Sequence, residues 1–268
     1  MQKLACPKCH FPLHLENKTF KCENNHCYDL SKRGYINLLL NPDKATNNPG
    51  DSKESLIARK SYLNQGYYDV ILNQVIQVIE QLKQRDNLSI LDLGCGEGYY
   101  TKGLKEHFFN SDVYGLDISK IAIDMATRYR KDITWIVGNS KNIPIQDHSL
   151  DFVCALFTVV NKDELKRILK KGGYIVHVTA NANHLLEIKK LIYDEIKIKS
   201  DKYLRLGFHE AMSYDFIEKV NIPNREDALN LLQMTPHYYH IKKEKRGVLD
   251  TLQGLDITID IKITVYEV

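Results

Sequence analysis

The 268-residue sequence has no long hydrophobic run and little excess of either charge. No apolar stretch approaches the roughly 18 residues of a membrane-spanning helix. The stretch Met1–Cys6 lacks the apolar core of a signal peptide. A net charge of +3 excludes a polycation that binds nucleic acid through its overall charge. We therefore expect a cytoplasmic protein without a membrane partner, in which any contact with nucleic acid uses a local basic patch.

Cysteine is sparse beyond residue 27, because four of the six cysteines lie within the first 27 residues. In a reducing cytosol such residues remain thiols or bind metal. Cys6-Pro7-Lys8-Cys9 forms a C-x-x-C pair, and Cys22 is followed by His26 and Cys27. Two pairs of soft ligands separated by a hairpin over 14–21 predict one structural zinc ion with four ligands. The spacing leaves the fourth ligand open between His26 and Cys27.

The predicted metal site defines a small N-terminal unit. Residues 1–40 are too few to bury a sufficient core alone, so the metal would supply folding free energy. Residues 41–53 are rich in polar and turn-forming residues and predict a linker, with Ser52 capping a helix over 53–64. Together with this linker, residues 41–268 form the larger predicted domain.

Within the larger domain, short apolar runs alternate with stretches of helical periodicity. A helix over 69–84 carries its apolar residues on one face and is expected to pack on a sheet. Strands are predicted at 90–93, 113–116, 134–137, 151–156, 174–179 and 257–266, with further helices at 99–107 and 185–193. This alternation predicts an α/β fold with a parallel, doubly wound sheet.

The strand over 90–93 leads into a turn that contains Gly94, Gly96 and Gly98. Glycine lets the backbone approach a ligand closely, and open α/β sheets bind ligands at the carboxyl ends of their strands. The G-x-G-x-G spacing differs from the dinucleotide fingerprint, and no P-loop Lys-Ser/Thr pair follows. Asp117, about 20 residues further on, suits the two hydroxyls of a ribose. The pattern therefore predicts a nucleoside ligand without a pyrophosphate.

The glycine turn and Asp117 resemble the first two motifs of S-adenosylmethionine-dependent methyltransferases with a Rossmann-like sheet. The resemblance implies that the Gly94–Gly98 backbone and Glu97 line the amino-acid end of the cofactor and that Asp117 holds the ribose. The stretch Gly138–Pro144 resembles the loop after the third strand, which places Asn139 near the adenine amino group. The expected fold is a Rossmann-like class I methyltransferase sheet with a small N-terminal zinc-ribbon domain.

The zinc segment joined to this cofactor domain resembles the bacterial 23S ribosomal RNA (guanine-N1)-methyltransferases over nearly the whole chain. The resemblance implies that the zinc ligands are Cys6, Cys9, Cys22 and His26. It also implies that Tyr68 and His184 contact the cofactor, whereas residues of these types are otherwise read as a core aromatic and a local helix cap. The resemblance rests on the cysteine pair, the glycine turn and the stretches Cys22–His26, Gly34–Leu39, Pro49–Ser52, His184–Leu185 and Leu231–Pro236.

One stretch departs from the family pattern. After the strand over 151–156 the family has an aromatic residue, a small residue and a proline. Here the sequence is Phe157-Thr158-Val159-Val160, which keeps the aromatic residue and lacks the proline. The shape of the base pocket is therefore expected to differ.

The resemblance implies a guanine in a 23S ribosomal RNA hairpin as substrate and a homodimer as assembly. Guanine N1 is buried in a Watson–Crick pair, so the target must be a loop nucleotide or a flipped one. Tyr67 and Tyr239 are candidates to stack on splayed bases. The sequence does not identify the acceptor of the N1 proton. Asp51 and Glu97 are the first carboxylates to test, although Asp51 also suits a turn former and Glu97 a cofactor ligand. The cations expected to contact RNA phosphates are Lys3, Lys8, Lys18, Lys21, Lys32 and Arg33.

Two other functions share part of this evidence. A methyltransferase that acts on a small molecule or a protein would carry the same cofactor motifs, and only the zinc segment and the linker disfavour it. A zinc-ribbon RNA-binding protein with an inactive methyltransferase domain is the second alternative. The intact glycine turn and Asp117 disfavour that reading.

Overall fold

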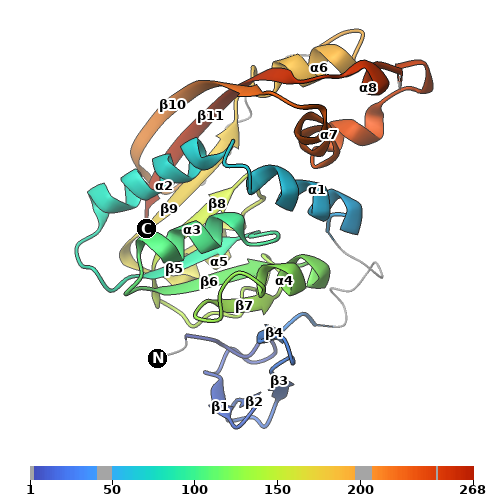
Figure 1. The fold of residues 1–268 in the computed structure, drawn as a ribbon. Coiled ribbons are helices and arrows are strands. Elements are labelled where there is room, and N and C mark those ends of the chain that lie inside the picture. The colour runs from blue at the N-terminus through green and yellow to red at the C-terminus, as the bar shows by residue number, and fades with distance from the viewer. Residues whose placement is uncertain (1–2, 41–49, 197–206, 246) are drawn as a thin grey trace.

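The structure, a computed structural model, describes residues 3–40, 50–196, 207–245 and 247–268. A large twisted sheet forms its centre, and the small ribbon of the N-terminal segment lies at one end (Figure 1). Most of the predicted linker, residues 41–49, lies outside the described residues. Within the described residues, no helix is both long enough and apolar enough to cross a membrane.

The large sheet has eight strands in the order β10-β11-β9-β8-β5-β6-β7-β4. Neighbouring strands from β4 to β9 pair in parallel, and β11 pairs antiparallel with both β9 and β10. The strands are β4 (Tyr35–Asn37), β5 (Ser89–Leu93), β6 (Asp112–Asp117), β7 (Thr134–Val137), β8 (Leu150–Leu156), β9 (Leu169–Ala180), β10 (His209–Ile222) and β11 (Leu255–Glu267).

This mixed sheet corrects the expectation of a parallel one. Alternation of side chains shows which residues face each side of a sheet, but it gives no direction for the neighbouring strand. The strand predicted over 257–266 is present as β11, and it lies between β9 and β10. The sequence analysis does not predict β10, an edge strand whose residues before Ile222 are all at least partly exposed. Its inward side chains Met212, Tyr214, Phe216 and Val220 are only partly buried against the core.

Helices form where the sequence predicts them, with small shifts at their ends. Ser52 caps α1 (Lys53–Leu63) by accepting the Ser55 N–H at 3.1 Å. In α2 (Asp69–Leu82) the buried residues Ile71, Val75, Val78 and Ile79 lie at helical spacing. The other α-helices are α3 (Tyr99–His107), α4 (Lys120–Ala126), α5 (Lys162–Ile168), α6 (Leu186–Ile192), α7 (Arg225–Gln233) and α8 (Gly247–Thr251).

Two core clusters cover opposite faces of the sheet. Ile90 of β5 belongs to a cluster that includes α2 and α3. Leu91 and Leu93 of the same strand belong to a second cluster that includes α5. Successive strand residues point to opposite faces, so β5 is buried on both sides.

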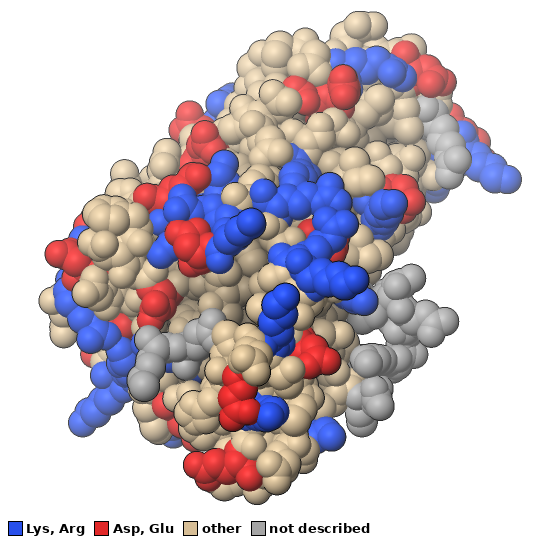
Figure 2. All heavy atoms as spheres, turned by 60° about the horizontal axis from the view of Figure 1, so that its bottom comes forward, with Lys and Arg blue, Asp and Glu red and all other residues tan. Residues whose placement is uncertain are grey.

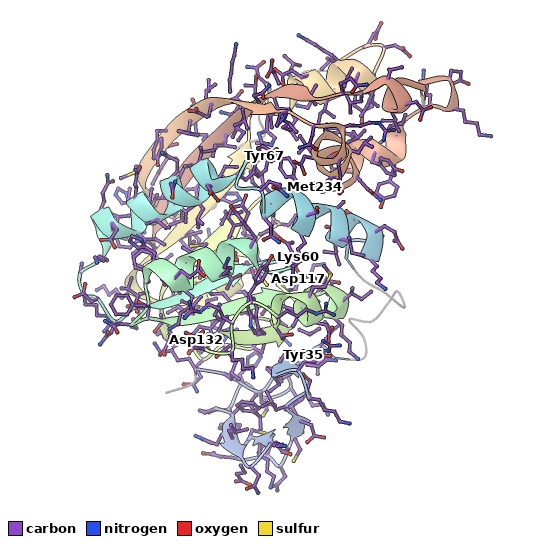
Figure 3. All side chains as sticks on the ribbon, viewed as in Figure 1. Tyr35, Lys60, Tyr67, Asp117, Asp132 and Met234 are labelled. Atoms are coloured by element: carbon purple, nitrogen blue, oxygen red, sulfur yellow. The ribbon has the colours of Figure 1, made fainter. Side chains whose placement is uncertain are left out.

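The N-terminal segment forms a three-stranded antiparallel sheet of β1 (His14–Glu16), β2 (Thr19–Lys21) and β3 (Cys27–Asp29). The predicted hairpin over 14–21 is present, with Asn17 at a φ of 59° in its turn. The chain then leaves this small sheet, and β4 pairs with β7 in the large one. Figure 3 shows Tyr35 of β4 at the junction between the two parts. The first 40 residues, expected as a zinc-binding unit, therefore also supply an edge strand of the large sheet.

Candidate functional site

The ribbon brings together four side chains with metal-ligand chemistry. The sulfur atoms of Cys6, Cys9 and Cys22 and Nδ1 of His26 all lie within 4.8 Å of one another. His26 Nδ1 is 3.4 Å from the Cys6 sulfur and 3.5 Å from each of the other two. Ligands about 2.0–2.3 Å from a zinc ion have such separations at the corners of a tetrahedron. Three sulfurs and one imidazole therefore fit a closed zinc site.

Cys27, the other candidate fourth ligand, points elsewhere. Its side chain is exposed, and its thiol donates to the Asn25 carbonyl at 3.4 Å. Asn25 has a φ of 60°, a left-handed turn that places His26 toward the three sulfurs before the chain enters β3. The geometry therefore favours His26 over Cys27.

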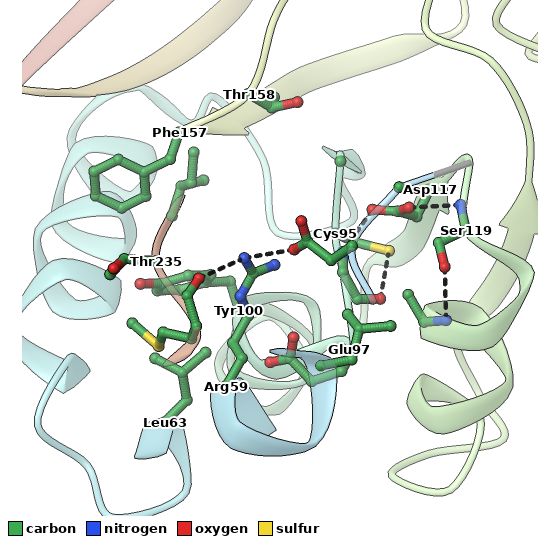
Figure 4. A pocket seen from close by; sticks show the side chains of 18 of the residues that line it. Arg59, Leu63, Cys95, Glu97, Tyr100, Asp117, Ser119, Phe157, Thr158 and Thr235 are labelled. Carbon is green, nitrogen blue, oxygen red and sulfur yellow. Dashed lines mark hydrogen bonds and ion pairs between the residues drawn. The ribbon is translucent and has the colours of Figure 1, made fainter. Parts of the chain in front are cut away.

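A cavity of 560 Å³ opens at the carboxyl ends of β5, β6 and β8, a size typical of small-molecule sites (Figure 4). Its floor is the glycine turn, and its sides are the segments that follow β6 and β8. The helix α1, the residue before α2 and the segments after β9 and α7 also contribute to the lining. The lining includes Gly50, Asp51, Arg59, Tyr68, Gly94, Gly96, Glu97, Tyr100, Asp117, Ser119, Phe157, His184, Met234 and His237.

The turn at the floor depends on left-handed backbone. Gly94, Gly96 and Gly98 have φ values of 73°, 56° and 90°, which residues with a Cβ rarely adopt. The Gly96 N–H donates to one carboxylate oxygen of Asp117 at 2.9 Å, and the Ser119 N–H donates to the other at 2.8 Å. These bonds fix Asp117 beside the turn. Burial raises the pKa of Asp117, and the two N–H donors oppose that rise.

Three buried polar atoms beside the turn have no hydrogen-bond partner among the described residues. They are Glu97 Oε1 and the hydroxyl oxygens of Tyr68 and Tyr100, all from residues that line the cavity. A buried polar atom without a partner costs free energy. The residues therefore fit a ligand that brings both donors and acceptors, as an amino-acid group does.

His184 is in the cavity wall rather than in a surface cap. Its side chain is buried, and Nδ1 accepts the Asp260 N–H at 3.3 Å. Its ring is 6.3 Å from the Tyr68 ring and 5.6 Å from the Phe157 ring. Burial, together with the charge of Lys189, lowers the pKa of His184 to about 4, so the ring is neutral at physiological pH.

Asn139 differs from the other candidate cofactor residues, because it does not line the cavity. Its side-chain oxygen accepts the Lys141 N–H at 3.0 Å within its own loop. Its assignment to the adenine stays a prediction. Phe157 does line the cavity, with a left-handed φ of 55° and 43% exposure, so the departure from the family pattern leaves an aromatic ring at the opening.

Sequence reasoning missed Arg59, Tyr100 and the segment Met234–His237 as parts of the site. Arg59 Nη2 donates to the Met234 carbonyl at 3.4 Å across 175 residues of sequence. No pattern of neighbouring residues in the sequence predicts that α1 contacts the end of α7. Tyr100 comes two residues after Gly98, so its position close to the glycine turn was the available signal.

Sequence profiles of known families match both parts of the chain. Residues 91–177 match a methyltransferase domain, and residues 4–45 match the N-terminal zinc ribbon described as RlmA, N-terminal. The chain therefore joins an RlmA-type zinc ribbon to a methyltransferase domain. The ribbon match contains the four metal-ligand side chains, and the methyltransferase match contains the glycine turn and Asp117.

Two curated relatives match the chain along nearly its whole length. It is 26% identical to the 23S rRNA (guanine(748)-N(1))-methyltransferase of Streptomyces fradiae, over 98% of this chain and 95% of that protein. It is 27% identical to a Bacillus subtilis protein provisionally named as a 23S rRNA (guanine-N1)-methyltransferase. That alignment covers 97% of this chain and 95% of the relative. A demethylmenaquinone methyltransferase of Geobacillus is 25% identical but matches only 60% of this chain.

Solved structures share the fold. The crystal structure of a provisionally named methyltransferase from Bacillus halodurans aligns with a TM-score of 0.52 at 14% identity. The alignment covers 73% of this chain and 97% of that one. The chain therefore has the class I methyltransferase fold.

Proposed function

We propose that this chain transfers a methyl group from S-adenosylmethionine to N1 of a guanine in a 23S ribosomal RNA hairpin loop. One observation supports this proposal most directly. The alignments with two relatives named for this reaction include both the ribbon and the cofactor domain, and they cover 95% of each relative. The menaquinone enzyme matches only part of this chain. The full-length match therefore favours the ribosomal RNA substrate over a small molecule.

The proposed cofactor supplies an activated methyl group on a sulfonium sulfur. Asp117, fixed by two N–H donors, would accept both ribose hydroxyls. Glu97 would accept from the cofactor's amino group at its unpartnered oxygen. The proposed cofactor-binding residues are Tyr68, Gly94, Gly96, Glu97, Asp117 and His184, and the proposed zinc ligands are Cys6, Cys9, Cys22 and His26.

Transfer joins the methyl carbon to guanine N1, leaves the electron pair of the broken carbon–sulfur bond on sulfur, and releases the N1 proton. Catalysis of this step consists mainly of positioning. The proton must pass to an acceptor near the cavity opening. The Asp51 side chain is 45% exposed, whereas Glu97 is 2% exposed. We therefore propose Asp51 as the first acceptor to test.

The surface offers local charge for RNA despite the small net charge. Lys60 and Lys102 both lie over the Tyr129 ring, with ammonium-to-centroid distances of 4.2 and 5.4 Å. Burial lowers the pKa of Lys60, and the charges of Arg128 and Lys102 lower it further. A phosphate placed among these cations would relieve their repulsion. Figure 2 shows Lys and Arg side chains gathered on the face above the ribbon in that view.

Several of the predicted RNA contacts already have partners in the protein. Lys21 pairs with Glu16 at 2.7 Å, Arg33 pairs with Asp124 at 2.9 Å, and Lys3 Nζ donates to the Ser149 carbonyl at 2.9 Å. These three cations are therefore weaker candidates for phosphate contacts than the sequence suggests.

Tyr67 is a weaker candidate for stacking on an RNA base than the sequence suggests. Its hydroxyl donates to Asp227 at 2.8 Å, and its ring stacks on Tyr62 with a centroid distance of 5.1 Å. Tyr67 is therefore held in protein packing. Tyr239 is 64% exposed and remains a candidate for stacking.

The test is methylation of 23S ribosomal RNA prepared from cells that lack the gene. We expect labelled methyl in the RNA and a reverse-transcription stop at one loop guanine, because a methyl on N1 blocks Watson–Crick pairing. The Asp117→Ala variant should give neither signal. Label in protein or small molecules alone would favour the first alternative function. RNA binding without cofactor binding would favour the inactive RNA-binding protein.

The homodimer implied by the family resemblance also belongs to this proposal. Light scattering of the purified chain should give twice the mass of one chain. A ribosomal RNA substrate would place the protein in the cytoplasm, as the sequence analysis expects.

A further inference from the structure

We infer that Arg59 binds the α-carboxylate of S-adenosylmethionine and selects ligands that carry the amino-acid group. The inference rests on the proposed cofactor, and it assigns a role to a residue outside the glycine turn. Arg59 belongs to α1, and its side chain reaches into the cavity near Glu97 and Tyr100 (Figure 4).

The guanidinium presents one of its sides to the glycine turn. Nη2 forms an ion pair with Asp51 Oδ2 at 2.6 Å and donates to the Met234 carbonyl at 3.4 Å. Nη1 lies 3.5 Å from the point that a Cβ on Gly96 would occupy. It makes no hydrogen bond to the residues that the structure describes. A guanidinium carries five N–H donors, so donors remain for a ligand that approaches over Gly96.

The charges around Arg59 determine which end of an amino-acid group belongs beside it. Glu97 Oε1 is buried and has no hydrogen-bond partner among the described residues. As a carboxylate oxygen it accepts hydrogen bonds, so it suits a donor such as an ammonium group. Burial raises the pKa of Glu97, and the charge of Arg59 is the largest influence that opposes this rise. An α-carboxylate would be repelled by Glu97 and attracted by Arg59. The ammonium therefore belongs at Glu97 and the carboxylate at the guanidinium.

Further donors lie on the same side of the cavity. The hydroxyls of Tyr68 and Tyr100 are buried there without partners among the described residues. The Arg59 charge also acts on both hydroxyls, lowering their pKa values against the larger effect of burial. A carboxylate next to Arg59 would accept hydrogen bonds from these groups as well. Charge-assisted hydrogen bonds of this kind are short and strong.

The competing explanation is that Arg59 only ties the segment at Asp51 to the segment at Met234. The two explanations differ in their dependence on the ligand. A tie would matter equally for every ligand of the cavity. A carboxylate contact would matter only for ligands that contain the carboxylate.

The experiment compares two ligands by calorimetry on the purified full chain. S-adenosylhomocysteine contains the amino-acid group, whereas 5′-methylthioadenosine keeps the adenosine and thioether without it. We expect Arg59→Gln to weaken S-adenosylhomocysteine binding by about 10- to 100-fold, the typical loss for a hydrogen-bonded charge. Binding of 5′-methylthioadenosine should change by less than about 2-fold.

Asp51→Asn is the matched control, because it breaks the ion pair and leaves the guanidinium in place. We expect this variant to bind S-adenosylhomocysteine as tightly as the wild type or more tightly. Arg59→Lys keeps the charge without the planar fork and should give an intermediate loss. Thermal denaturation without ligand reports whether each variant is folded.

Equal losses for both ligands, or no loss for either, would overturn the inference and leave Arg59 as a structural tie. A comparable loss in Asp51→Asn would also contradict it. If the wild type binds 5′-methylthioadenosine but not S-adenosylhomocysteine, the carboxylate subsite is wrong. If the wild type binds neither ligand, the proposed cofactor is wrong and the inference falls with it.

Discussion

Gly98 packs directly against the indole of Trp135. A Cβ on Gly98 would lie 2.6 Å from Trp135 Cη2 and 2.9 Å from the Cβ of Ala126. Trp135 is 1% exposed on β7, and its Nε1 donates to the Arg130 carbonyl at 3.0 Å. The ring therefore cannot easily move aside. The third glycine of the turn is required by packing as well as by its φ of 90°.

We expect Gly98→Ala to lower the free energy of unfolding by about 2–4 kcal/mol, since it adds overpacking to a strained φ. Gly172→Ala is the matched control, with a φ of 74° and nothing within 4 Å of the added Cβ. Its cost should be about 1–2 kcal/mol, from the backbone alone. Urea unfolding measures both variants. Equal losses would show that the contact with Trp135 has no effect on stability.

The zinc cluster gives a prediction with an internal control. Cys22→Ala should abolish zinc binding, because it removes one of four convergent ligands. Cys27→Ala should retain about one zinc ion per chain, since its exposed thiol points away from the cluster. Elemental analysis of the purified variants measures the zinc content. Loss of zinc in Cys27→Ala would contradict the assignment of His26 as fourth ligand.

Asp92 should make stability depend on pH. It is 2% exposed beneath the turn and accepts a hydrogen bond from Thr101 at 2.6 Å. Burial raises its pKa to about 7, against the opposing effect of Thr101. Between the unfolded pKa of about 4 and this value, the native state binds a proton that the unfolded chain lacks. Unfolding free energy should therefore fall as pH rises through that window, by up to about 1.4 kcal/mol per pH unit.

The Asp92→Asn variant isolates this effect, because the amide keeps an acceptor for Thr101 and does not titrate. Urea unfolding between pH 4.5 and 8 measures the free energy of unfolding. Its decrease with pH should be smaller in the variant than in the wild type, by up to about 1.4 kcal/mol per pH unit. Parallel profiles would mean that Asp92 has no raised pKa in the native state.

Lys102 tests the proposed RNA surface. Lys102→Ala should weaken binding to the 23S hairpin and reduce the salt dependence of the binding constant by roughly one counterion. Lys219→Ala, which changes an exposed residue of β10, is the control and should leave the slope unchanged. Filter binding at several salt concentrations measures both. An unchanged slope for Lys102→Ala would place the RNA on another face.

Features set by local sequence were predictable. The strand over 134–137 has the predicted bounds, and the Ser52 cap is present. Both depend on neighbouring residues: an apolar run in one case, and a hydroxyl three residues before its donor in the other. Asp117 lies beside the glycine turn as expected, because β5 and β6 are adjacent parallel strands and their ends meet.

Features set by tertiary contacts were not predictable from local sequence. The direction of β11 follows from its place between β9 and β10, which alternation does not encode. The contact of Arg59 with Met234 joins helices far apart in sequence. Tyr67 has an aromatic ring that could stack on a base, but its hydroxyl donates a hydrogen bond to the buried Asp227.

The pairing of β4 with β7 limits where the chain can be divided. A fragment that begins at residue 41 would lose β4 and leave the backbone of β7 as an unpaired edge. It would also lose Leu4, Cys6 and Phe20, which are buried in the same core cluster as β5 and α5. Uncovered apolar edges promote aggregation. Ribbon and sheet should accordingly melt in a single transition, so that chelating the metal lowers the melting temperature of the entire protein.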